Sequence, residues 1–223
     1  MKKILFVGNS FTYYNDMPTE IFPAICAAAG VEVQVDAVVK GGWFLSQFAN
    51  EKDAFGALLR QKLSENQYDI IILQEQSGLP AKEPLCFYHS VRELTALIRP
   101  TGAKILLYQT WGYKEGYFKL PSCGGTPEIM ADRLRQAYRF IAAQTKADVA
   151  PVGDAMLHIY RHTDIDVYRP DLFHPSLAGS TLAAWVIFAR IFGMDPRNIS
   201  YDGQMSPGEG KLLKEAAFRS VLA

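Results

Sequence analysis

Short apolar segments recur along the chain and have the character of β-strands. Four of them consist almost entirely of apolar residues, many β-branched, as is typical of strands buried on both faces of a parallel sheet. Another alternates apolar and polar residues, which indicates a strand with one less buried face. The expected strands are Ile4–Val7, Val31–Val39, Ile70–Leu73, Ile105–Tyr108 and Val149–Val152.

The segments between these strands repeat apolar residues with the period of a helix. The expected helices are Pro18–Ala29, Leu45–Leu63, Leu85–Ile98, Pro127–Thr145 and, after the last strand, Leu177–Phe192. Strands that alternate with helices of this length predict βαβ units. We therefore predict an α/β protein, a three-layer α/β/α sandwich around a flavodoxin-like, doubly wound parallel sheet of about five strands.

The length and composition fit one globular domain. A chain of 223 residues can bury one substantial core, so we expect residues 1–223 to form a single domain, with a helical extension over residues 194–223. Hydrophobic residues make up 49% of the chain, and the formal net charge is zero. A neutral chain is a poor candidate for binding nucleic acid or an anionic membrane, so we expect neither partner.

The N-terminus predicts a cytoplasmic protein. Two lysines are followed only by Ile4–Val7 before Gly8, which is too short for the apolar region of a signal peptide. No apolar run approaches the roughly 20 residues of a membrane-spanning helix. Cys26, Cys86 and Cys123 are far apart and form no CxxC motif, so we interpret them as reduced thiols rather than as a zinc site or a disulfide framework.

Ser10 lies where a ligand site is expected. Ligands of parallel α/β sheets bind at the carboxyl ends of the strands, and only two residues separate Ser10 from the end of the first strand in "VGNSFTYYN". Its hydroxyl could act as a nucleophile if a base lay nearby. Two other interpretations stay open from this segment alone: Ser10 could simply begin a helix, or the turn from Gly8 to Thr12 could bind a phosphate group.

A candidate base lies near the C-terminus, in "PDLFHPS". Asp171 and His174 are three residues apart just before a helix, so the carboxylate could fix the tautomer of the imidazole while its other nitrogen faces outward. Acyl transfer also needs hydrogen-bond donors for the oxyanion that forms.

Candidate donors follow the other strands at the same rim. They are the backbone of Gly41 and Gly42 in "KGGW" and the side chains of Gln74 and Gln76 in "LQEQSG". Polar amides directly after a buried strand suit hydrogen bonding into a cleft better than packing.

Together these residues resemble the four sequence blocks of the SGNH or GDSL-type hydrolases. "VGNS" is similar to the block of the nucleophile, "KGGWFL" to the glycine block, "LQEQSG" to the G-x-N-D block and "DLFHP" to the D-x-x-H block. Their order and spacing agree over nearly the whole chain. The resemblance implies an SGNH-type serine hydrolase in which Ser10 is the nucleophile and His174, oriented by Asp171, is the base.

The same resemblance implies an oxyanion hole formed by the amides of Ser10 and Gly42 and the side chain of Gln76, with Gly41 as the rival of Gly42. The chain departs from the usual pattern in the third block, where Gln76 replaces an asparagine and Gln74 a glycine. This departure indicates a divergent branch of the superfamily. It also leaves open whether Gln76 or Gln74 supplies the third donor.

The resemblance further implies an esterase that hydrolyses a small acyl ester, with O-acetyl groups on a carbohydrate as the expected substrate and with neither metal nor cofactor. Tyr13, Trp43 and Trp111 are the aromatic residues that we expect to contact substrate, together with Gln74. A flavodoxin-like module for a nucleotide or phosphate and a non-catalytic carbohydrate-binding relative are the alternatives. The number of subunits is not predicted.

Overall fold

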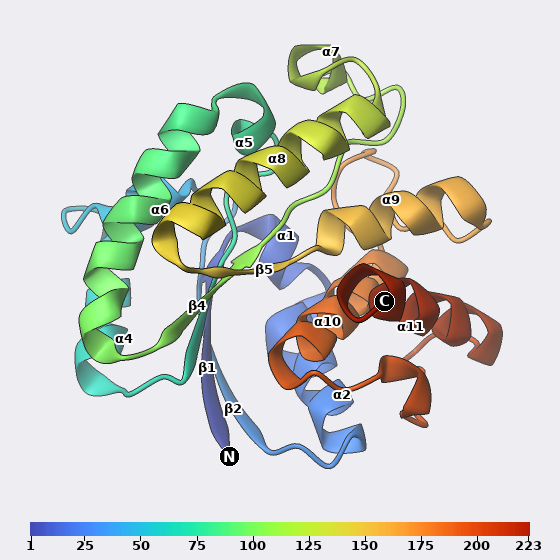
Figure 1. Ribbon diagram of the computed structural model, residues 1–223, viewed down its shortest axis with the longest axis horizontal. Coiled ribbons are helices and arrows are strands. Elements are labelled where there is room, and N and C mark those ends of the chain that lie inside the picture. The colour runs from blue at the N-terminus through green and yellow to red at the C-terminus, as the bar shows by residue number, and fades with distance from the viewer.

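The computed structural model describes residues 1–223 and contains a parallel five-stranded sheet between two layers of helices (Figure 1). The strand order is β2-β1-β3-β4-β5, and every neighbouring pair is parallel. The strands are β1 (Lys2–Gly8), β2 (Val33–Val39), β3 (Ile70–Leu73), β4 (Lys104–Tyr108) and β5 (Asp148–Ala150). This order confirms the predicted doubly wound α/β/α sandwich. Because the chain reverses its direction of winding at β1, a crevice is expected between the carboxyl ends of β1 and its neighbours.

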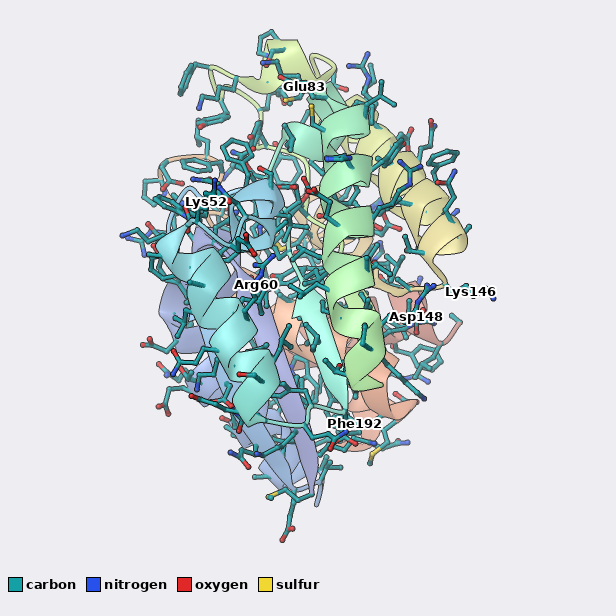
Figure 2. The ribbon with its side chains drawn as sticks, turned by 90° about the vertical axis from the view of Figure 1, so that its left-hand side faces the viewer. Lys52, Arg60, Glu83, Lys146, Asp148 and Phe192 are labelled. Atoms are coloured by element: carbon teal, nitrogen blue, oxygen red, sulfur yellow. The ribbon has the colours of Figure 1, made fainter.

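Helices cover both faces of the sheet. On one face lie α4 (Ala54–Glu65), α6 (Pro84–Ile98) and α8 (Pro127–Thr145), and on the other α2 (Phe22–Ala28) and α10 (Leu177–Phe192) (Figure 1). Figure 2 looks onto α4 and α6. The shorter elements at the rim and edges are α1 (Ser10–Tyr13), η1 (Tyr14–Asp16), η2 (Met17–Ile21), α3 (Leu45–Ala49), α5 (Leu79–Lys82), η3 (Arg99–Thr101), α7 (Leu120–Cys123), α9 (Val152–His162) and η4 (Pro196–Asn198). No helix is both long and apolar enough to cross a membrane.

The central strands are buried because helices pack on both of their faces. Residues 4–7 of β1 and 71–73 of β3 have no exposed surface, which accounts for their unbroken apolar sequence. Helix α10 is buried over most of its length, from Ala178 to Ala189. The predicted strands and the helices Pro127–Thr145 and Leu177–Phe192 therefore agree with the structure to within a few residues.

The expected single helix Leu45–Leu63 is wrong, because the chain forms two helices there. Helix α3 ends at Ala49, and α4 begins after Asp53, whose side chain accepts a hydrogen bond from the amide of Phe55. A short polar side chain such as that of Asp53 can bond to the backbone in place of helical hydrogen bonds, so it favours the start of a helix over the interior. The two helices cross so closely that a Cβ atom on Gly56 would lie 1.9 Å from the carbonyl oxygen of Asn50.

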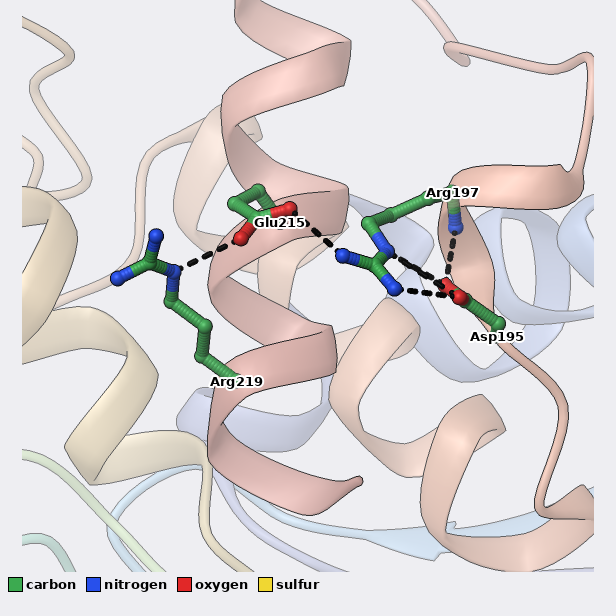
Figure 3. A network of polar contacts seen from close by, with 4 residues as sticks. All are labelled: Asp195, Arg197, Glu215 and Arg219. Carbon is green, nitrogen blue, oxygen red and sulfur yellow. Dashed lines mark hydrogen bonds and ion pairs between the residues drawn. The ribbon is translucent and has the colours of Figure 1, made fainter. Parts of the chain in front are cut away.

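The C-terminal segment folds back as helix α11 (Pro207–Val221), which packs against α10 and α9. Ser206 begins it with a capping box. A chain of ion pairs, shown in Figure 3, joins α11 to the preceding turn. Arg197 contacts Asp195 at 2.8 Å and Glu215 at 3.3 Å, and Glu215 also contacts Arg219 at 2.8 Å. The extension thus covers neighbouring helices and not the sheet itself.

Candidate active site

The turn after β1 places Ser10 at the start of α1. Asn9 caps this short helix by accepting a hydrogen bond from the amide of Phe11 at 3.2 Å. The amide of Ser10 has no intrahelical partner, since the first amides of a helix have none. The turn requires glycine at residue 8, because a Cβ atom there would lie 2.4 Å from the Thr12 hydroxyl. The Ser10 hydroxyl and amide therefore both belong to the rim at the carboxyl end of the sheet.

Gln74 lies beneath this turn and is fully buried. Its Oε1 accepts hydrogen bonds from the Asn9 amide and the Thr12 hydroxyl, each at 2.8 Å, and its Nε2 donates to Asn9 Oδ1 at 3.0 Å. The amide group of Gln74 is thus occupied within the protein. The expectation that Gln74 contacts substrate is wrong. Gln76 is only partly buried and donates one Nε2–H to Ser77 Oγ at 3.0 Å, so its second N–H can face a ligand.

The D-x-x-H segment folds into a tight turn beside Ser10. Asp171 Oδ1 accepts hydrogen bonds from the amides of Phe173 and His174, at 3.2 and 3.0 Å, and Leu172 adopts a positive φ of 70°. His174 Nδ1 lies 2.8 Å from Asp171 Oδ2, and His174 Nε2 lies 2.9 Å from Ser10 Oγ. The three side chains form a continuous chain of hydrogen bonds, from carboxylate to imidazole to hydroxyl.

The surroundings of Asp171 favour its ionised form. Partial burial by itself would raise the pKa of this carboxyl, but hydrogen bonds from the His174 ring and from the amides of His174 and Phe173 outweigh it. The pKa of Asp171 therefore lies below its ordinary value. A carboxylate held in this state can fix the imidazole tautomer and stabilise an imidazolium.

Aromatic rings hold the His174 imidazole in place. Tyr14 stacks on it with ring centroids 4.3 Å apart, Phe173 lies at 3.8 Å, and Phe11 meets it edge-on at 5.9 Å. The guanidinium of Arg169 lies 5.1 Å from the centroid of the Tyr14 ring. Packing of this kind restricts the imidazole to the orientation that points Nε2 at Ser10.

Asn15 joins the two loops that carry Ser10 and His174. Its side-chain amide donates to the carbonyl of Ser176 at 3.0 Å and to the hydroxyl of Ser180 at 2.8 Å. Asn15 has a positive φ of 56°, a conformation that asparagine tolerates better than most residues. Our reading of the sequence missed this residue, because its partners lie some 160 positions away in the chain.

A cavity of about 250 Å³ opens beside Ser10 and His174. Gly42 and Gln76 also line it, so the structure brings together the residues of all four sequence blocks. Gly42 has a positive φ of 76°, which favours glycine, whereas Gly41 lies outside the lining and close to the Tyr13 hydroxyl. The lining is Asn9, Ser10, Phe11, Gly42, Gln76, Ser77, Tyr117, Lys119, Phe173 and His174.

A second cavity, of about 300 Å³, adjoins the first through Gln76 and Lys119. The loop between β4 and α8 and the helices α5 and α7 supply most of its wall. A larger cavity, of about 590 Å³, lies elsewhere, at the amino ends of β4 and β5, and contains no residue of the four sequence blocks. Figure 2 shows Lys146 and Asp148 of that cavity well apart from Glu83, which lines the second one. Size alone would therefore not select the cavity that contains Ser10 and His174.

The aromatic residues expected at the substrate divide into two groups. Trp111 is fully buried, stacks on Phe11 at 4.1 Å and donates its indole N–H to the carbonyl of Phe173. It has no free face for a sugar ring, so that expectation is wrong.

Trp43 and Tyr13 keep some exposed surface but line neither of the two cavities, and their contact with substrate stays a prediction. Tyr117 and Phe173, which stack on each other at 4.9 Å, line the first cavity instead. Tyr117 lies in the long, glycine-rich loop of residues 110–126, and Phe173 lies within the D-x-x-H block.

Solved structures of similar fold include several hydrolases. A protein from Slackia heliotrinireducens that is assigned to the SGNH hydrolases is 33% identical, over 83% of this chain and 96% of its own, with a TM-score of 0.72. A DUF4886 family protein from Bacteroides uniformis is 18% identical, over 98% of this chain and 93% of its own, with a TM-score of 0.85. Axe2, an acetylxylan esterase from Geobacillus stearothermophilus, is 16% identical, over 87% of this chain and 95% of its own, with a TM-score of 0.63.

No model of a protein family and no curated protein sequence matches the chain. The structural match to the Slackia heliotrinireducens protein, by contrast, combines substantial identity with coverage of nearly the whole of that protein. The chain thus belongs to the SGNH hydrolase superfamily.

Proposed function

We propose that the protein removes small acyl groups, and specifically O-acetyl groups on carbohydrates, through an acyl-enzyme formed on Ser10. The observation that carries this proposal is the chain of hydrogen bonds from Asp171 through His174 to Ser10 at one wall of a cavity. The serine has its base within hydrogen-bond reach, and the base has its orienting carboxylate, as nucleophilic catalysis by serine requires.

In the first half of the reaction, His174 Nε2 accepts the proton of Ser10 while Ser10 Oγ attacks the carbonyl carbon of the ester. The imidazolium that forms is stabilised by Asp171 at 2.8 Å. The carbonyl oxygen becomes an oxyanion, for which the amides of Ser10 and Gly42 and the side chain of Gln76 are the available donors. The C–O bond to the alcohol then breaks, and His174 gives its proton to that oxygen.

In the second half, water replaces the alcohol. His174 accepts a proton from this water, which attacks the carbonyl carbon of the acyl-serine, and the same donors stabilise the second oxyanion. Collapse of this intermediate breaks the bond to Ser10 Oγ, which takes the proton back from His174. The products are the free acid and the unmodified enzyme.

The size and lining of the cavities support a small acyl group on a larger polar alcohol. The space beside Ser10 is about 250 Å³, and two of its lining residues, Gln76 and Lys119, also line the second cavity. Tyr117 offers an aromatic surface in the first cavity. Axe2, described as an acetylxylan esterase, shares the fold, which makes an acetylated sugar the first substrate class to test.

A phosphate-binding role for the turn after β1 has less support. The amides of Asn9 and Phe11 already donate to the side chains of Gln74 and Asn9, so few donors remain for phosphate oxygens. The side chain of Phe11 packs in the core against Trp111.

The test combines labelling with substitution. A fluorophosphonate should modify Ser10, as read by mass spectrometry of peptides, and p-nitrophenyl acetate should be hydrolysed. Ser10→Ala and His174→Ala should each abolish hydrolysis while leaving the melting temperature nearly unchanged. Ser46→Ala, an exposed serine on α3, is the matched control and should keep full activity. Undiminished activity of Ser10→Ala would refute the proposal.

A further inference from the structure

Glu75 is a fully buried carboxyl group that the proposed mechanism does not use. It lies directly after β3, between Gln74, which supports the nucleophile turn, and Gln76, which lines the cavity. Its Oε1 accepts hydrogen bonds from the amide of Gln76 at 2.6 Å and from the amide of Leu45 at 3.0 Å. Its Oε2 is buried and has no hydrogen-bond partner.

A buried carboxyl group at this position lowers the stability of the folded protein. Burial raises the pKa of Glu75 to about 7, and the hydrogen bonds from the Gln76 and Leu45 amides lower it only in part. Glu75 forms no ion pair, and the Tyr138 hydroxyl nearby is also buried without a hydrogen-bond partner. An apolar residue would avoid this cost of burial. The position therefore calls for an explanation other than packing.

The two amides that Glu75 binds belong to the segments that supply the oxyanion donors. Leu45 begins α3 directly after the turn that contains Gly42, and Gln76 carries the candidate side-chain donor. The segment after Gly42 is also anchored by Asn9, whose Nδ2 donates to the carbonyl of Trp43 at 2.9 Å. Glu75 is the one side chain whose single oxygen joins the glycine segment to the glutamine segment.

We propose that Glu75 is a positioning residue of the oxyanion hole, which sets the spacing between the Gly42 amide and the Gln76 side chain. This inference rests on the proposed function of the same site. Donors must be in place before the oxyanion forms, since a preorganised site avoids reorganisation during the reaction. Without the shared acceptor, the Leu45 and Gln76 amides would separate, and the developing charge would meet poorly aimed donors.

The test compares Glu75→Gln with Glu75→Leu. Glutamine keeps an oxygen at the Oε1 position and can accept both amides, whereas leucine has a similar volume and no acceptor. We measure kcat and KM for p-nitrophenyl acetate, the Ki of methaneboronic acid, which forms a tetrahedral adduct on serine, and the melting temperature. Ile141→Ala in α8, a fully buried site that lines none of the cavities, controls for a loss of stability without a loss of donors.

Glu75→Leu should lower kcat by about a hundredfold with little change in KM, since a displacement of about 1 Å in a catalytic group can cost that much. The Ki of methaneboronic acid should rise in parallel, because the adduct uses the same donors. Glu75→Gln should restore most of kcat, and Ile141→Ala should keep it. Equal losses of kcat in both Glu75 variants, or wild-type kcat in folded Glu75→Leu, would overturn the inference.

A further pair of variants applies if Glu75→Leu does not fold. Leu45→Pro removes the amide donor at a first helical position, where proline is tolerated, and Leu45→Ala keeps the amide while removing a similar part of the side chain. A kcat of Leu45→Pro well below that of Leu45→Ala supports the inference, and equal values refute it. Failure of wild-type enzyme to hydrolyse the ester would instead refute the proposed function, so the two failures are distinguishable.

Discussion

The burial of Glu75 predicts how the stability of the protein depends on pH. The pKa of this group rises from its ordinary value of 4.5 to about 7 in the folded protein, chiefly through burial. A folded-state pKa above the unfolded one means that folding favours the protonated form. The stabilisation is therefore complete below about pH 4.5 and is lost as the pH rises through about 7. At about 1.4 kcal/mol per pKa unit, the loss amounts to about 3 kcal/mol.

The neighbours of Glu75 do not cancel this effect. Its contacts are the backbone amides of Leu45 and Gln76, which do not titrate, and burial raises the pKa of the Tyr138 hydroxyl further above neutrality. Glu75→Gln removes the titrating group while keeping its shape, so the difference between wild type and variant isolates the contribution of this one side chain.

Urea unfolding followed by circular dichroism gives the free energy of unfolding of both proteins between about pH 4.5 and pH 8. The free energy of wild type relative to Glu75→Gln should fall by about 3 kcal/mol across this range. The measurement compares two proteins at each pH, so contributions from other groups cancel. If the relative free energy is the same at both ends of the range, Glu75 does not titrate as its burial requires, and the reasoning is refuted.

Other consequences are open to direct measurement. Gln76→Ala should lower kcat by roughly a hundredfold with a small change in melting temperature, whereas Gln74→Ala should mainly lower the melting temperature, because Gln74 supports the nucleophile turn. Asp171→Asn should reduce kcat by more than about a hundredfold on p-nitrophenyl acetate, and a near-normal kcat would show that the base needs no carboxylate. Gly56→Ala should lower the free energy of unfolding by about 2–3 kcal/mol in urea, since its Cβ would clash with the Asn50 carbonyl. Lys119 lines both cavities and forms no ion pair, so Lys119→Ala should reduce kcat/KM for an ester that carries a carboxylate and leave a neutral acetate ester unaffected.

Much of the fold and part of the candidate site can be predicted from local sequence. The strands at residues 4–7 and 70–73 are recognisable because burial on both faces demands continuous apolar residues. Ser10, Gly42 and Gln76 could be placed on one rim because all strands of a parallel sheet end on the same side, whereas His174 was assigned from the D-x-x-H pattern. Each of these predictions depends on residues close together in the chain or on the topology that they imply.

The sequence does not show which individual side chains at the rim face the cavity and which face the core. Trp111 and Tyr117 are both aromatic residues of one loop, yet Trp111 fills the core and Tyr117 lines the cavity. Gln74 and Gln76 are equally polar, yet the buried amide of Gln74 is consumed by the turn after β1. Residue type does not distinguish these cases, because the direction of each side chain depends on what packs against it from distant segments.

The sequence by itself thus determined the doubly wound architecture, the rim on which chemistry is expected and the membership of Ser10, Asp171 and His174 in one candidate site. Only the tertiary structure decided which glutamine faces the cavity, that Asn15 links the loops that carry Ser10 and His174, and that Glu75 joins the segments of the proposed oxyanion donors. The physical reason is the separation in the sequence over which each kind of interaction acts. Apolar periodicity and helix caps act between neighbours in the chain, whereas these hydrogen bonds form only after folding has brought residues from separate strands to the same rim.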